Sequence, residues 1–332
     1  MITNLKLKLR SEYDSEKWDN QVSLLGGEFF HCHASAIYRA KLIGGQTLFF
    51  DAQDRTGNCV GVAVGVIATP KTWPLSRYSR IVSFAATPIA NGNIEIESWI
   101  LEQIEQKLEK MGVFRIEFDS YHSRNSNDLL PKHGYDIIMR HEYEFNLKLE
   151  IDELFAAISS TKRKHYRKAE NGGVTTREVE GFEAVKLVEH FRDLAMDRRA
   201  LSRAKKDNRV IEARQGLFSS GHTRVLVSDL NEEPVGACIF GVFNNRVYAF
   251  RSGSSNIGND CYSPVHLYWS AVNLFKNEGY CSLGLGGAKE NEAGIRKFKQ
   301  MLGTDESIQP SGSKILSVFG AKLDALRKKL RH

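Results

Sequence analysis

Cysteine is scarce in this sequence: there are five in 332 residues, and no two form a Cys-x-x-Cys pair. An odd number without such pairs argues against a disulfide framework and favours a reducing compartment, so we expect a cytoplasmic protein. Long apolar runs are absent as well. The longest, Cys59–Ala68, contains two glycines and has about half of the roughly 20 residues that a membrane-spanning helix needs. We therefore expect a buried strand there.

Some kinds of catalytic centre are also missing. No serine–histidine–acid set and no pair of catalytic carboxylates stands out along the chain. His31, Cys32 and His33 form a short cluster of metal-binding side chains. Because no further ligands follow at the spacing of a structural zinc site, we expect no metal.

Charge of one sign is concentrated in one half of the chain. The composition is that of a soluble globular protein, with a net charge of +6. Residues 151–332 hold 29 basic and 21 acidic residues, whereas residues 1–150 hold 17 and 19. The basic half is compatible with a polyanionic partner such as nucleic acid, a nucleotide-linked substrate or acidic lipid. Solvated helix faces rich in lysine and arginine explain it equally well.

Hydrophobic periodicity predicts the same order of elements in both halves of the sequence. Each half is predicted to contain helices, three antiparallel strands, a long helix, a strand, a helix and closing strands. The helix–glycine–strand junction around Gly112 parallels the one around Gly279. This architectural repeat predicts two α+β domains, 1–150 and 151–332. In the second half, helices are expected over 154–170, 182–203 and 321–330, and a strand over 308–319.

The stretch from Ser263 to Gly303 is the most informative part of the second half. Ser263 and Pro264 mark the start of a helix, with the serine as N-cap, and Gly279 marks its end. A strand is expected over 280–285, broken by Gly286 and Gly287. A second helix then places Ile295, Phe298 and Leu302 inward, with basic residues around them. This order is typical of a unit that builds a binding site.

This layout resembles the GNAT acyltransferase fold in tandem. With Thr161-Lys-Arg-Lys-His-Tyr-Arg-Lys-Ala169 opening the second half and Gly294-Ile-Arg-Lys-Phe-Lys-Gln-Met-Leu-Gly303 near its end, the chain resembles the Fem-like transferases. Those proteins consist of two GNAT domains and pass an amino acid from aminoacyl-tRNA to an amine of a peptidoglycan precursor. Related sequences are acetyltransferases of BioF2-like or CelD-like type. The resemblance implies two mixed, mostly antiparallel sheets flanked by helices.

The resemblance also implies roles for individual residues. In the family a Thr-x-Arg motif holds substrate phosphates, and the matching residues are Thr161 and Arg163. Arg167 stands where the family has a tyrosine, and Lys41 is the nearest counterpart of a phosphate-binding lysine in the first domain. The Phe-Lys pair of the family matches Phe298 and Lys299, where the lysine lies beside the reacting carbonyl.

General chemistry supports two of these positions independently. Acyl transfer to an amine builds negative charge on a carbonyl oxygen, and a fixed cation such as Lys299 stabilises that charge. The guanidinium of Arg163 suits phosphate oxygens better than an ammonium does. Asp119, at the end of a predicted strand, is the candidate for a general base, although the amine can also lose its proton to solvent.

The sequence leaves the acyl donor open. GNAT proteins that use acetyl-CoA carry a Gln/Arg-x-x-Gly-x-Gly/Ala loop that holds the pyrophosphate. The corresponding stretch, Arg251–Gly258, has glycines at the wrong spacing, and Pro264 removes one N–H donor. The loop therefore favours aminoacyl-tRNA as donor and no bound cofactor. Acetyl-CoA-dependent acylation of an amino sugar, and a non-catalytic tandem GNAT binding module, are the alternatives.

The C-terminal helix bears on possible partners. Leu323, Leu326 and Leu330 share one face, surrounded by basic residues. A helix that caps the second domain accounts for this pattern, and so does a basic amphipathic surface for an anionic membrane or a lipid-linked acceptor. The acceptor is expected to be nucleotide- or lipid-linked, and the protein is expected in the cytoplasm, with peripheral contact to the inner membrane face as one option.

Overall fold

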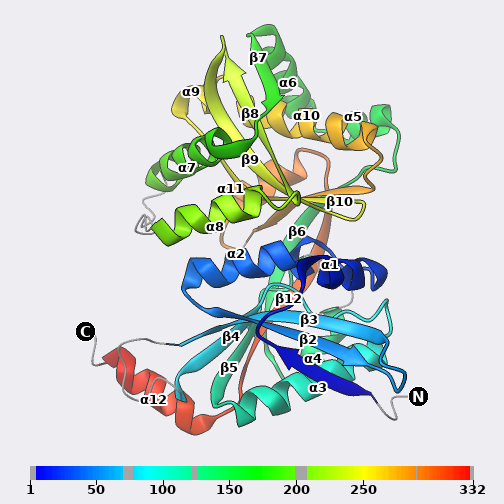
Figure 1. Cartoon of the computed structure of the whole chain (residues 1–332). Helices are drawn as coiled ribbons and strands as arrows, with labels where there is room; N and C mark the ends of the chain where they lie inside the picture. Colours follow the sequence, from blue (N-terminus) through cyan, green and yellow to red (C-terminus); the bar gives the residue numbers. More distant parts are fainter. Residues whose placement is uncertain (1–4, 70–77, 122–125, 199–207, 289, 330–332) are drawn as a thin grey trace. The chain divides into compact units, whose positions relative to one another are not determined.

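The computed structural model describes residues 5–69, 78–121, 126–198, 208–288 and 290–329 (Figure 1). The chain forms two compact units, which we call unit 1 (residues 1–140 and 309–332) and unit 2 (residues 141–308). These bounds differ from the expected 1–150 and 151–332. The reason is that the last strand, β12, pairs with strand β5 of unit 1 through Gly312–Ile315, and the helix after it, α12, packs on the same strand.

Unit 1 is built on a sheet in the order β1–β2–β3–β4–β5–β12. Its strands are β1 (Lys6–Arg10), β2 (Gln46–Gln53), β3 (Cys59–Ala68), β4 (Arg80–Phe84), β5 (Val113–Phe118) and the C-terminal part of β12 (Asp305–Ile315). Its helices are α1 (Ser15–Leu24), α2 (His33–Ile43), α3 (Ile94–Lys110), α4 (Ser126–Lys132) and α12 (Val318–Lys329). Adjacent strands are antiparallel except β4 and β5, which α3 connects in parallel.

Helix α3 shows how local sequence sets these elements. The Asn93 side chain accepts a hydrogen bond from the Ile96 amide and caps the helix. Ile100, Ile104 and Leu108 recur at helical spacing and are fully buried against the sheet. Gly112 ends the helix with a φ of 77°, a conformation that costs glycine little. The next residue opens β5.

Unit 2 contains sheet strands in the order β6–β11–β10–β9–β8–β7. Its strands are β6 (Asp136–Asn146, entering from unit 1), β7 (Val174–Glu178), β8 (Thr223–Leu230), β9 (Glu233–Phe243), β10 (Arg246–Ser254) and β11 (Ser282–Ala288). Its helices are α5 (Ile151–Ala157), α6 (Ser160–Asn171), α7 (Gly181–Arg198), α8 (Asn208–Phe218), α9 (Asn256–Asp260), α10 (Ser263–Asn277) and α11 (Ala293–Gln300). Only β10 and β11 are parallel among the described strands of this unit, and α10 connects them.

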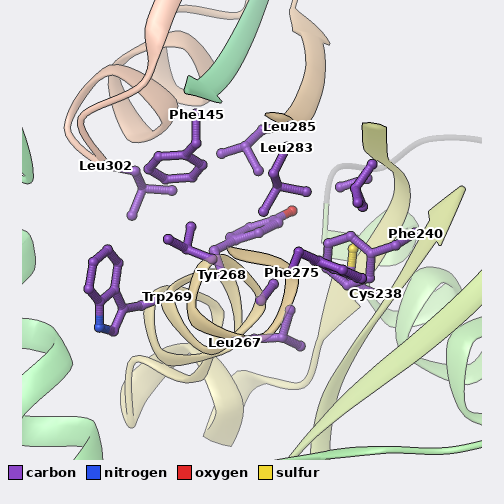
Figure 2. Packing of buried hydrophobic residues seen from close by; sticks show 14 of the residues in the cluster. Phe145, Cys238, Phe240, Leu267, Tyr268, Trp269, Phe275, Leu283, Leu285 and Leu302 are labelled. Carbon is purple, nitrogen blue, oxygen red and sulfur yellow. The ribbon is translucent and has the colours of Figure 1, made fainter. Parts of the chain in front are cut away.

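The core of unit 2 lies between α10 and the sheet. Figure 2 shows Tyr268 and Phe275 of α10 facing side chains from the strands, among them Phe240 and Leu283. Phe240, Phe275 and Leu283 are fully buried, and burying such a side chain contributes about 1.5–3 kcal/mol. The core fixes α10, and hence the residues at its first turn, relative to the sheet.

The structure corrects three details of the expected elements. The helix expected over 154–170 is two helices, α5 and α6, because Ile158 has an extended backbone with ψ at 134°. Tyr262, and not Ser263, occupies the N-cap of α10, since the amides of Val265 and His266 both donate to its carbonyl. The strand expected over 308–319 runs from 305 to 315. The end of the helix expected over 182–203 falls partly outside the described residues.

Candidate active site

The sheet of unit 2 opens next to β11. Strands β10 and β11 pair through Arg246–Tyr248 and Ser282–Gly284, yet they continue to Ser254 and Ala288. On its other side β11 has a bulge against β6 between Gly284 and Gly287. The expected strand break at Gly286 and Gly287 is therefore this bulge, within the strand. Gly286 has a φ of 73°, and the bulge turns backbone carbonyls out of the ladder.

Lys299 of α11 binds those carbonyls. Its ammonium donates to the carbonyl oxygens of Gly286 at 2.7 Å and Gly287 at 2.9 Å. The ammonium also lies 5.6 Å from the centroid of the Tyr143 ring. The residue is only 9% exposed. A lysine this buried is rarely unpaired, and here the bulge carbonyls stabilise its charge.

Glu306 holds α11 in place against β6. Its carboxylate accepts hydrogen bonds from the Gln300 amide at 2.7 Å and the Tyr143 hydroxyl at 3.1 Å. His141 Nδ1 lies 2.5 Å from the same carboxylate. The bond from Gln300 contributes most to lowering the pKa of Glu306. Helix α11 is thus tied to β6 at the residue next to Lys299.

A cavity of about 300 Å³ lies beside Lys299, within unit 2. It is lined by Ala195, Arg198, Gly236, Ala237, Cys238, Ser252, Gly253, Ser254, Asn259, Ser263, Pro264, Leu267, Tyr268, Gly294, Ile295, Phe298 and Lys299. The charged side chains of this lining are Arg198 and Lys299, both cations. A cavity of this size suits a small acyl group rather than a folded partner.

Phe298 forms part of the cavity wall. The Lys162 ammonium lies 4.4 Å from its ring centroid, and burial lowers the pKa of Lys162. The Tyr268 ring is 6.3 Å away on a neighbouring helix. The structure therefore brings the predicted pair Phe298 and Lys299 to one cavity and places the α6 cation Lys162 beside them.

Ser263 also belongs to the cavity lining, in the first turn of α10. It is fully buried, and its hydroxyl has no hydrogen-bond partner among the described residues. An unpaired buried hydroxyl costs about 1–3 kcal/mol, and a serine that lines a cavity at a helix N-terminus is near the backbone amides that favour an anion. The sequence suggested only a capping role for this serine.

The three α6 residues expected to bind phosphate differ in their contacts. Thr161 and Arg167 are exposed. The Arg163 guanidinium instead donates through Nη1 to the carbonyls of Ala156, at 2.7 Å, and Ile158. Arg163 thus caps the C-terminal end of α5. Beside Arg167, the Tyr166 ring lies nearly parallel to His266, with centroids 5.5 Å apart.

Arg163→Ala is expected to lower stability, because two carbonyls at the α5–α6 junction lose a charged donor. Such hydrogen bonds contribute about 1.5–3 kcal/mol when buried, and partial exposure reduces this to about 1–2 kcal/mol. Urea denaturation measures the change, and Arg167→Ala is the matched control because its side chain is exposed. Equal stability of the two variants would contradict the role of Arg163 at the junction.

Asp119 and Lys41 belong to unit 1. Asp119 follows β5 and pairs with Arg39 at 3.1 Å. Burial raises the pKa of the Asp119 carboxyl, against a smaller lowering by the guanidinium groups of Arg39 and Arg140. Lys41 is exposed in the last turn of α2. Lys299 and Phe298 lie in unit 2, so the predicted site residues are divided between the units.

The His31–Cys32–His33 cluster has structural contacts. The His31 ring is buried and lies 2.9 Å from the Thr87 carbonyl through Nε2. Its Nδ1 accepts the Glu28 amide at 3.2 Å, and burial lowers its pKa. His33 stacks on Phe49 with centroids 5.3 Å apart. Within the described ranges, no three His, Cys, Asp or Glu side chains converge as metal ligands would.

Comparison with solved structures identifies the fold. FemX matches with a TM-score of 0.74 at 14% identity, over 96% of this chain and 99% of its own. The fold is that of the tandem GNAT proteins. A tandem GNAT protein of the clavulanic acid pathway matches with a TM-score of 0.56 at 11% identity, over 95% of this chain and 99% of its own. The fold class predicted from the sequence is confirmed.

A third match comes from a different kind of protein. The C-terminal domain of a putative lysylphosphatidylglycerol synthetase from Agrobacterium fabrum matches with a TM-score of 0.59 at 14% identity, over 96% of this chain and 97% of its own. No family model matches the sequence, and no curated protein does. At these identities the likeness establishes the tandem GNAT fold.

Sequence reasoning misses several residues that line the cavity of this tandem GNAT fold. It indicates core packing for Tyr268 and capping for Ser263, the common roles for residues at such positions. The structure confirms Tyr268 in the core and adds that its hydroxyl donates to Ser252 at 3.1 Å. Arg198 donates to the Ser254 carbonyl at 2.6 Å. The one signal in the sequence for these cavity-lining residues is that α10 connects β10 to β11, the two strands that separate beside the cavity.

Proposed function

We propose that this tandem GNAT protein is an acyltransferase that moves an aminoacyl group from aminoacyl-tRNA to an amine of a peptidoglycan or other cell-envelope precursor. The observation that carries the proposal is the buried ammonium of Lys299, held at the wall of a small cavity. The overall likeness to FemX supports the choice of donor, as does the excess of basic residues in 151–332.

The proposed reaction uses the Lys299 charge at the acyl carbonyl. The acceptor amine attacks the ester carbonyl carbon of the donor and forms a C–N bond. The C–O bond to the terminal ribose then breaks, and a proton passes from the amine nitrogen to the leaving oxygen or to solvent. Negative charge on the carbonyl oxygen is stabilised by the Lys299 ammonium at short range. Asp119 is the proposed base where solvent does not take the proton.

The proposal assigns the remaining predicted residues to the acceptor. Thr161, Arg163, Arg167 and Lys41 would contact phosphates of a nucleotide- or lipid-linked acceptor. Nη1 of Arg163 serves the α5–α6 junction, so a phosphate would have to use the other guanidinium nitrogens or compete with the carbonyls. Such a reaction would take place in the cytoplasm or at the inner face of the membrane. None of the described helices is long and apolar enough to span a bilayer.

A transfer assay tests the proposal. The full chain is incubated with a mixture of charged tRNAs and a nucleotide-linked muropeptide, and the acceptor mass is measured. We expect a gain of one aminoacyl residue that disappears after ribonuclease treatment. Acylation of an amine from acetyl-CoA alone would instead support the second candidate, and no transfer from either donor would favour a non-catalytic binding module.

The second candidate is acyl transfer from a coenzyme A thioester to an amino sugar. The buried residue Ser263 favours it, because it lies in the first turn of the 15-residue helix α10 and lines the same cavity as Arg198. Both features suit an anionic part of the donor.

Titration calorimetry with acetyl-CoA separates the two candidates. The missing glycine pattern between Arg251 and Gly258 predicts no saturable binding at micromolar concentration. A one-to-one micromolar site that Ser263→Ala weakens at least about fivefold would replace the leading proposal with the thioester reaction. Ser270→Ala, on the same helix but outside the cavity lining, is the matched control.

A further inference from the structure

Helix α12 packs on unit 1 through a glycine. A Cβ added at Gly320 would lie 2.6 Å from the Tyr78 carbonyl oxygen and would also collide with the Phe114 side chain. The amide of Leu316, just before the helix, donates to the Phe114 carbonyl at 2.7 Å. The helix backbone therefore lies directly on the start of β5. The expected docking of this helix on the second domain is wrong, because its contacts are with β5 of unit 1.

The face of α12 away from β5 carries exposed apolar side chains on either side of Lys322. Val318 is 69% exposed, Phe319 58% and Leu326 49%. Val318, Lys322 and Leu326 follow one another at four-residue spacing, so they form a single stripe. Leu323, expected on the same face as Leu326, is half-buried instead. Ile315, at the end of β12, is also 53% exposed. We call Ile315, Val318, Phe319, Lys322 and Leu326 the α12 stripe.

The α12 stripe differs from the other exposed apolar residues of the chain. A single exposed apolar side chain, such as Leu24 on α1, is ordinary on a soluble protein. Here four exposed apolar residues lie within twelve positions of the chain, and exposed apolar groups that gather in this way mark interaction sites. Charge identifies the kind of partner: residues 318–332 contain five basic residues and one acidic residue.

We propose that the α12 stripe binds the surface of an anionic lipid bilayer. Apolar side chains on one face of a basic helix insert between lipid headgroups, while lysine and arginine side chains pair with lipid phosphates. A second copy of this chain fits the stripe less well, because two segments of the same positive charge would face one another. This inference does not depend on the proposed reaction.

Co-sedimentation of the full chain with vesicles tests the proposal. Vesicles of phosphatidylcholine alone are compared with vesicles that contain about one quarter phosphatidylglycerol. We expect binding to the anionic vesicles only, and a decrease of at least about fivefold for Lys322→Glu, since one basic residue near such a surface contributes about 1 kcal/mol. The double variant Phe319→Ser/Leu326→Ser should lose at least about tenfold, because apolar burial is removed at two positions.

Leu24→Ser is the matched control, since Leu24 is 81% exposed on another element of unit 1. Its binding should equal that of the parent. Equal binding to both vesicle types, no binding to either, or an equal loss in Leu24→Ser would overturn the proposal. So would a lipid-free dimer in sedimentation velocity that Phe319→Ser/Leu326→Ser dissociates, because the stripe would then bind a second copy.

Discussion

Lys299→Met is expected to reduce turnover by at least about a hundredfold. Methionine keeps the length and apolar contacts of the lysine stem but removes the charge beside the proposed carbonyl position. Loss of one group that stabilises an oxyanion typically costs about 10²–10³ in turnover. The measurement is the single-turnover rate of aminoacyl transfer with saturating acceptor, which separates chemistry from binding.

The same variant is also expected to lose stability. The ammonium donates to two carbonyls of the β11 bulge, and methionine leaves both without this donor. The sequence alone predicts an unchanged melting temperature, since a helix-surface lysine contributes little. The two hydrogen bonds instead predict a loss of about 1–3 kcal/mol. Urea denaturation measures this loss, and turnover is compared only under conditions where the variant is folded.

Two further variants separate charge from folding. Lys297→Met changes an exposed lysine on the same helix and should leave both turnover and stability near those of the parent. Lys299→Arg keeps a cation but places it on a wider, planar group, and it should retain more turnover than Lys299→Met. If Lys299→Met reacts at the parental rate, the lysine is a structural anchor of the bulge and the proposed active site is wrong.

The sequence predicted the order of elements well where the periodic signal was strong. The repeat pattern of Ile100, Ile104 and Leu108 defines α3, and Gly112 and Gly279 end helices as expected. It did not predict the division of the chain. The pairing of β12 with β5 links residues almost 200 positions apart, and no local pattern specifies such a long-range contact.

The candidate site was predictable in part. The Phe-Lys pair follows from the resemblance, and the structure places both residues on one cavity. The partners of these residues were not predictable. Lys299 binds Gly286 and Gly287 only because a bulge exposes their carbonyls, and Arg163 closes α5 only because the helix breaks at Ile158. Both features arise from tertiary packing, which propensities do not contain.

Gly303→Ala is expected to be among the most destabilising single-methyl additions in unit 2. Gly303 follows α11 with a φ of 80°. A Cβ there would lie 2.7 Å from the Ala157 carbonyl carbon and 2.8 Å from the Ile158 amide nitrogen. The neighbouring Ser159 amide donates to the Met301 carbonyl at 3.0 Å, so α11 and the α5–α6 junction are joined at this point. The atoms that the added Cβ would meet belong to the backbone, so they cannot move aside by a change of rotamer.

The expected loss has two physical parts. A left-handed φ costs a non-glycine residue about 1–2 kcal/mol, and the collision with backbone adds about 1–3 kcal/mol. Gly279→Ala isolates the first part, because Gly279 has a φ of 85° and no atom lies within 4 Å of the position that its Cβ would take. Urea denaturation should therefore show a loss of about 1–2 kcal/mol for Gly279→Ala and about 2–5 kcal/mol for Gly303→Ala.

The turnover of folded Gly303→Ala tests whether the contact between α11 and the α5–α6 junction positions Lys299. If the collision moves α11 away from the junction, the Lys299 ammonium moves with it, and a displacement of about 1 Å at a reacting group can cost about 10²-fold. Folded Gly303→Ala should then transfer acyl groups far more slowly than folded Gly279→Ala. Equal turnover of the two folded variants would mean that α11 keeps its place without this contact, and that the bulge and Glu306 alone position Lys299.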